Sequence, residues 1–73
     1  MLRRVRPEDL IEGDVLYHGY GWGTFLRLVD RELDYVIHFR SRDEKAKRRS
    51  VRWERNRNVW ILERNEDVHE NQG

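Results

Sequence analysis

A glycine-rich stretch near the N-terminus constrains the fold of this chain more than any other feature. Between Gly13 and Leu28, two runs of strand-like composition flank the pentapeptide Gly19-Tyr20-Gly21-Trp22-Gly23. Three glycines in five positions leave the backbone free to adopt positive φ, so the two runs can fold back on each other. The stretch predicts a tight antiparallel hairpin that carries Tyr20 and Trp22 at its tip.

The length of the chain predicts a single domain with a small core. A domain of 73 residues buries only about 60 % of the surface of its unfolded chain. The 3 Trp, 3 Tyr and 2 Phe give enough bulk to close a short barrel, although 40 % of the residues are charged. The absence of cysteine excludes disulfides and thiolate metal sites, and is typical of a reducing compartment. Because no apolar run has membrane-spanning length and no secretory signal is recognisable, we expect a cytoplasmic protein with no membrane contact.

Alternating apolar residues and turn signals predict a mainly β fold. In the strand around Ile37, for example, Tyr35, Ile37 and Phe39 alternate with Val36 and His38. We expect the last strand to pair with the first, which gives a small five-stranded antiparallel barrel. The predicted strands are 15–18, 24–30, 33–40, 49–54 and 59–62.

The two ends of the chain differ from this central part. Residues 1–6 carry three arginines and predict a basic arm, and Pro7 followed by two acids suits one short helical turn. Leu10 and Ile11 should pack this turn against the barrel. Residues 65–73 are acidic and polar with almost nothing to bury, so we expect a disordered tail after a single domain over 1–64.

No catalytic or metal-binding pattern stands out. The three histidines, His18, His38 and His69, lack the spacing and the companions of a metal site. The serines have no neighbouring base, and the glycine loop lacks the helix and lysine of a phosphate-binding loop. We therefore expect a protein that is not an enzyme and that uses no metal and no cofactor.

The charge pattern leaves two kinds of partner open. Residues 40–57 hold nine basic and three acidic side chains, whereas the net charge of the chain is only +1. The basic segment 42–57 could follow a nucleic-acid backbone, with Trp53 or Trp60 stacking on bases. Its 42–49 part could equally be a solvated loop, and Val51 and Trp53 alternate as core residues. Mixed charge in patches suits a protein surface better, because both signs can orient a partner.

The exposure of the aromatic residues depends on which face of the first strand is buried. If Leu16 and His18 point inward, Val15 and Tyr17 point outward beside Tyr20 and Trp22 and form an apolar patch. The opposite arrangement, in which Tyr17 is buried, is equally compatible with the pattern.

Several short motifs resemble those of Tudor-like barrels. They are Gly13-Asp14, His18, Gly21-x-Gly23-Thr24 and Ile61-Leu62-Glu63. The likeness covers about residues 13–63. In this part the chain resembles the C-terminal Tudor domain of UvrD/PcrA-type helicases and, more loosely, the RNA-polymerase-interacting domains of CarD and transcription-repair coupling factors. Trp22 replaces a smaller residue of those families, and the 41–49 loop is longer and more basic, so their binding face is not carried over.

The whole chain also resembles small bacteriophage-encoded regulators of host RNA polymerase. The resemblance implies a non-catalytic monomer that docks on the bacterial polymerase core, with or without host elongation factors, hinders σ-dependent initiation and promotes antitermination. Direct binding of RNA or DNA through 42–57 is the alternative, and a structural or partner-inhibiting module is a third class. The candidate partner-binding residues combine the arm, the rings and the basic segment: Arg3, Arg4, Arg6, Tyr17, Tyr20, Trp22, Lys47, Arg48 and Arg49.

Overall fold

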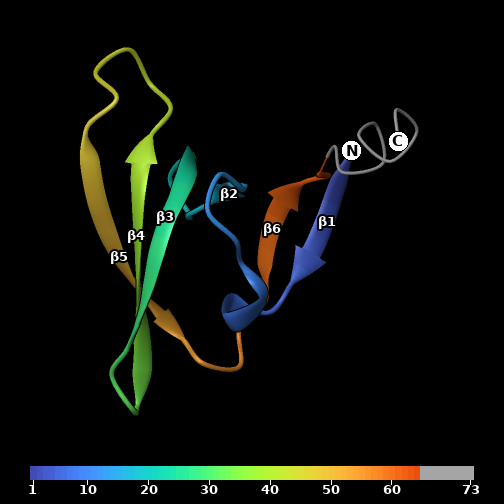
Figure 1. Ribbon diagram of the computed structural model, residues 1–73, viewed down its shortest axis with the longest axis vertical. Coiled ribbons are helices and arrows are strands. Elements are labelled where there is room, and N and C mark those ends of the chain that lie inside the picture. The colour runs from blue at the N-terminus through green and yellow to red at the C-terminus, as the bar shows by residue number, and fades with distance from the viewer. Residues whose placement is uncertain (65–73) are drawn as a thin grey trace.

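The computed structural model of the protein describes residues 1–64, and the acidic tail predicted over 65–73 lies outside the described residues. The fold is mainly β, as predicted: six antiparallel strands form one sheet in the order β1-β6-β2-β3-β4-β5. In Figure 1, β3, β4 and β5 lie on one side, β1 and β6 lie on the other, and β2 lies between them. The strands are β1 (Leu2–Val5), β2 (Val15–Tyr17), β3 (Trp22–Asp30), β4 (Asp34–Ser41), β5 (Arg48–Glu54) and β6 (Val59–Leu62).

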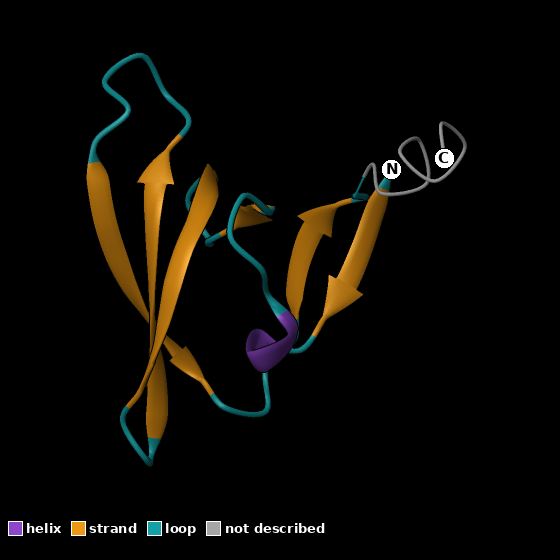
Figure 2. Ribbon diagram, viewed as in Figure 1, coloured by secondary structure: helices purple, strands orange, loops and turns teal. Residues whose placement is uncertain are grey.

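The short helical turn forms where the sequence predicts it. It is the 3-10 helix η1 (Pro7–Asp9), which connects β1 to β2 and is drawn in purple in Figure 2. Pro7 supplies the fixed φ of the first turn, and two acids follow it at the positive end. Leu10 packs into the core behind the turn, but Ile11 is 54 % exposed, contrary to expectation.

Two features of the predicted barrel need correction. The sequence predicts a basic arm over residues 1–6, whereas Leu2–Val5 is a sixth strand that pairs antiparallel with β6. The last strand does pair with the first predicted one, through Leu16 and Ile61. However, β1 and β5 are the two ends of the sheet in the part of the chain that the structure describes, so backbone pairing does not close the barrel.

The core follows the predicted alternation of side chains. Tyr35, Ile37 and Phe39 of β4 are buried, and Trp53 of β5 is only 3 % exposed. The indole N–H of Trp53 donates to the carbonyl oxygen of Arg57 at 3.0 Å, which satisfies its polar atom. The other buried apolar residues are Val5, Leu10, Leu16, Phe25, Val59 and Ile61.

The glycine-rich stretch forms the predicted hairpin, with its turn at residues 18–21. The second strand of the hairpin, β3, begins at Trp22, two residues earlier than predicted, and Trp22 pairs with Tyr17. Gly19 has a φ of +109°, which favours glycine. Gly23 is required for a different reason, since a Cβ atom there would stand 2.4 Å from Cδ2 of the Phe39 ring.

Candidate interaction surface

The strand order places four large side chains in one row on the outer face of the sheet. Arg4 of β1 lies opposite Trp60 of β6, and Tyr17 of β2 lies opposite Trp22 of β3. The pairing of Leu16 with Ile61 brings the neighbouring residues Tyr17 and Trp60 side by side across β2 and β6. We call Arg4, Trp60, Tyr17 and Trp22 the ring row.

The members of the ring row contact one another and remain open to solvent. The guanidinium carbon of Arg4 lies 5.4 Å from the centroid of the Trp60 ring, within the range of a cation–π contact. Tyr17 and Trp22 meet edge to face, with ring centroids 5.4 Å apart. Trp60 and Tyr17 are 44 % and 39 % exposed, and Trp22 is half-buried. These rings are therefore held in place and accessible at once.

Aliphatic side chains extend the ring row along the same face. Leu2 and Leu62 are direct cross-strand partners and are 50 % and 41 % exposed. Each lies two residues from a member of the ring row, so it points to the same side of the sheet. Val15 is half-buried on that side of β2. The result is a contiguous apolar surface, the kind that marks interaction sites.

The structure shows which face of β2 is buried, a question that the sequence leaves open. Leu16 is fully buried, so Tyr17 points outward, and Tyr20 at the hairpin tip is 95 % exposed. The Tyr17 hydroxyl donates to the carbonyl oxygen of Gly19 at 3.2 Å and thereby joins the strand to the turn. All three candidate aromatic residues thus lie in one region, with Tyr20 projecting beyond the ring row.

The three arginines of the predicted arm go to different places. Arg4 joins the ring row through Trp60, while Arg6 forms an ion pair with Glu8 beside η1. Arg3 pairs with the buried Ile61 and thus lies on the opposite face from Arg4. Because β6 and β2 separate β1 from β3, the arm does not meet Trp22 directly.

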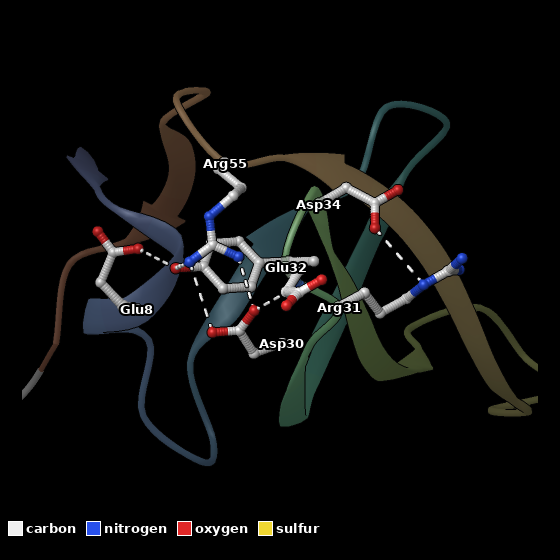
Figure 3. A network of polar contacts seen from close by, with 7 residues as sticks. Glu8, Asp30, Arg31, Glu32, Asp34 and Arg55 are labelled. Carbon is white, nitrogen blue, oxygen red and sulfur yellow. Dashed lines mark hydrogen bonds and ion pairs between the residues drawn. The ribbon is translucent and has the colours of Figure 1, made fainter.

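The basic segment 42–57 is divided by the fold. Arg55 donates to both carboxylate oxygens of Asp30, at 2.7 and 3.4 Å (Figure 3). Its guanidinium also lies over the Tyr35 ring. Arg52 pairs with Asp34 at 3.1 Å, and Arg57 lies over Trp53. Arg52, Arg55 and Arg57 therefore have contacts within the fold, although Arg52 and Arg57 stay exposed. Lys47, Arg48 and Arg49 are also exposed, and no ion pair within residues 1–64 involves them.

A groove of about 620 Å³ opens at the end of the sheet near Arg49. Its wall includes His18, which stacks on Phe39 with 4.3 Å between ring centroids. Burial lowers the pKa of His18, and the charge of Arg49 lowers it further, against an opposing backbone hydrogen bond. A neutral imidazole is thus favoured, which suits a structural ring at the base of the hairpin turn.

Arg64 anchors the end of the described chain to the hairpin. Its guanidinium donates to both carboxylate oxygens of the buried Asp14, at 2.9 and 2.8 Å. Burial alone would raise the pKa of Asp14, but hydrogen bonds from Arg64 and from the Ile11 N–H outweigh this effect and lower it. This ion pair has a structural role.

No three His, Asp or Glu side chains within residues 1–64 lie close enough together to hold a metal ion. None of the helices in this part of the chain has the length and apolar character needed to cross a membrane. Comparisons of the chain with protein-family models, curated proteins and solved structures find no significant match.

Sequence reasoning missed part of this surface. Trp60 was assigned to possible base stacking rather than to a patch with Tyr17, and Leu2 and Leu62 were not candidates. The alternation of buried Val59 and Ile61 with Trp60 and Leu62 was the signal that could have placed them outside. Which residues lie beside Trp60 and Leu62 on the neighbouring strands depends on the strand order, and the local pattern does not reveal that order.

Proposed function

We propose that this protein is a non-enzymatic regulator of transcription that docks on bacterial RNA polymerase core through the ring row. The observation that supports this proposal is the exposure of organised aromatic and aliphatic side chains across β1, β6, β2 and β3. Aromatic residues beside arginine are the commonest energetic centres of protein interfaces. The polymerase enters the proposal through the resemblance to phage regulators and to CarD-type domains.

Docking of this kind would act by occupying a surface of the polymerase. The regulator would hinder σ-dependent initiation and promote passage of terminators, alone or with host elongation factors. The protein surface is suited to such binding because its rings are pre-positioned by edge-to-face and cation–π contacts. Little side-chain entropy is then lost when a partner covers them.

Replacement of Trp60 by Ala tests the proposal. Trp60 lies at the centre of the exposed surface and is 44 % exposed, so its loss should leave the fold intact. A central aromatic anchor is worth about 2 kcal/mol or more, which corresponds to an affinity loss of about 30-fold. Binding of purified polymerase core to immobilised protein measures this loss.

Leu33→Ala is the matched control for this experiment. Leu33 is an apolar residue with 91 % exposure in the turn between β3 and β4, away from the ring row. The Leu33→Ala variant should bind polymerase core with the affinity of the wild-type protein. Failure of the wild-type protein to retain polymerase core, or unchanged affinity of folded Trp60→Ala, would refute the proposal. A σ-dependent run-off assay and a terminator read-through assay then test the consequences for transcription.

A further inference from the structure

Three arginines gather on the outer face at one corner of the sheet. Arg40 of β4 and Arg48 of β5 are direct cross-strand partners. Arg42 follows Arg40 by two residues along the chain, and the backbone N–H of Arg42 donates to the carbonyl oxygen of Trp22 at 3.0 Å. All three side chains are exposed. We call this set the arginine corner.

The members of the arginine corner have no carboxylate partner within residues 1–64, unlike five other arginines of this protein. Those with a carboxylate partner are Arg6, Arg31, Arg52, Arg55 and Arg64. Within residues 1–64, in contrast, no ion pair involves a member of the arginine corner. Asp43 follows Arg42, but its Oδ1 accepts hydrogen bonds from the Ser41 hydroxyl and from two loop N–H groups, those of Lys45 and Ala46. Like charges directly opposite each other weaken a sheet, so Arg40 and Arg48 carry a cost in stability.

Protection of the sheet edge explains only part of this arrangement. Charged residues on an edge strand discourage pairing with other chains, and Arg48 lies on the edge strand β5. Arg40 lies on β4, which has strands on both sides, so edge protection gives no reason for an arginine there. An external anion does account for a second and a third guanidinium at the same corner.

Two hydrogen bonds hold the guanidinium groups without using up their donors. Nη1 of Arg40 donates to the carbonyl oxygen of Ala46 at 3.0 Å, and Nη1 of Arg42 lies 3.5 Å from the Thr24 hydroxyl. Each guanidinium has five N–H donors in a planar fork that matches phosphate oxygens. The remaining donors are therefore available to a ligand. Trp22, at the end of the ring row, is the neighbour of Arg42 across the β3–β4 pairing, and the two residues share a backbone hydrogen bond.

We propose that the arginine corner binds the phosphate backbone of a nucleic acid. This set of residues differs from the basic segment 42–57 predicted from the sequence. It includes Arg40, which lies before that segment, and it leaves out Arg52, Arg55 and Arg57, which contact Asp34, Asp30 and Trp53. Guanidinium groups without carboxylate partners beside an aromatic ring are the recurring features of sites that hold strands by phosphate contact and base stacking. The inference does not depend on polymerase binding.

Fluorescence anisotropy of labelled oligothymidylate, oligouridylate and duplex DNA tests the proposal. For a single strand, three phosphate contacts give a slope of about −2 in log K against log salt, or roughly a 20-fold loss between 50 and 200 mM salt. Arg40→Gln/Arg48→Gln should reduce that slope to about −0.7, the value for one contact. The control is Arg31→Gln/Arg52→Gln, which removes the same charge from a corner that has Asp34 as partner; it should keep the wild-type slope.

The outcomes separate the sources of phosphate and the classes of partner. Tighter binding of the oligonucleotides assigns the corner to single strands, whereas tighter binding of the duplex assigns it to double-stranded DNA; both support phosphate recognition. The proposal is overturned if no salt-dependent binding occurs, if both double variants lose affinity equally, or if polyglutamate displaces the oligonucleotides as well as unlabelled oligonucleotide does. Polymerase retention by Arg40→Gln/Arg48→Gln, measured in parallel, shows whether the two surfaces act separately.

Discussion

Replacement of Gly23 by Ala should destabilise the protein through one identifiable collision. The new methyl carbon would lie 2.4 Å from Cδ2 and 3.1 Å from Cγ of Phe39, and 3.2 Å from the carbonyl oxygen of Arg40. Carbon atoms normally approach to about 3.5–4 Å, so the ring would have to retreat by about 1 Å. Phe39 is 2 % exposed and is stacked against His18, so a retreat of the ring would disturb that stacking contact. Overpacking of this kind costs about 1–3 kcal/mol.

The other two glycines of the loop are matched controls with different expected results. At Gly21, the nearest atoms to a new Cβ belong to His18 and lie 3.8 and 3.9 Å away, an ordinary contact. Its φ is not positive, so Gly21→Ala should stabilise the fold by about 0.4–1 kcal/mol. Gly19 has open space but a φ of +109°, and alanine there should cost about 1–2 kcal/mol.

Urea unfolding followed by tryptophan fluorescence measures the three variants. With a slope of about 1 kcal/mol per molar urea for a small domain, Gly23→Ala should lower the midpoint by about 1–3 M. The penalty should shrink in a Phe39→Leu background, because the smaller side chain removes the aromatic carbons that collide. Equal midpoints for Gly23→Ala and Gly21→Ala would refute the proposed contact between Gly23 and Phe39.

Two further predictions concern ionisable groups. Asp14→Asn should lower the free energy of unfolding by about 1–3 kcal/mol, since the buried bonds to Arg64 lose their charge. Because the pKa of Asp14 is lowered in the fold, its contribution is complete above the ordinary value of 3.8 and is lost as pH falls through the lower folded value. Urea titrations from neutral to acid pH should show a smaller loss for Asp14→Asn than for wild type, and equal losses would contradict this. The pKa of His18 is lowered mainly by burial, so wild-type stability should decline as pH falls below the ordinary value of 6.5. His18→Phe keeps a ring against Phe39 and should flatten that decline, measured by midpoints near pH 7 and pH 5; an unchanged decline would exclude His18 as its source.

Most of the fold could be predicted from local patterns, because burial on one face of a strand gives a period of two. Tyr35, Ile37 and Phe39 show this period, and all three are buried as expected. The strand at Leu2–Val5 shows only one buried residue, and its two arginines gave it the appearance of an arm. It becomes a strand because β6 offers it a partner, which the local sequence does not reveal.

Part of the candidate surface was predictable in its residues, but its arrangement was not. Tyr17, Tyr20 and Trp22 were recognised because large rings near a turn are unusual, and strand pairing then determined which of them face solvent. The sequence does not indicate which acidic side chain, if any, lies beside a given arginine. Arg55 meets Asp30 from 25 positions away, whereas Arg40 meets no carboxylate partner within residues 1–64.

The ring row also has a consequence for the order in which parts of this surface form during synthesis and folding. Arg4 and Trp60 lie near opposite ends of the described chain, and their strands meet through pairs such as Leu2 with Leu62. Contacts between such distant positions require the closure of a long loop and form late relative to local hairpins. The hairpins of β3, β4 and β5 can form earlier, but the ring row is incomplete until residue 60 has been synthesised and β6 has met β1. A ribosome-bound fragment that ends before β6 would therefore contain Tyr17 and Trp22 but lack Trp60 and Leu62, and β1 would lack its pairing strand.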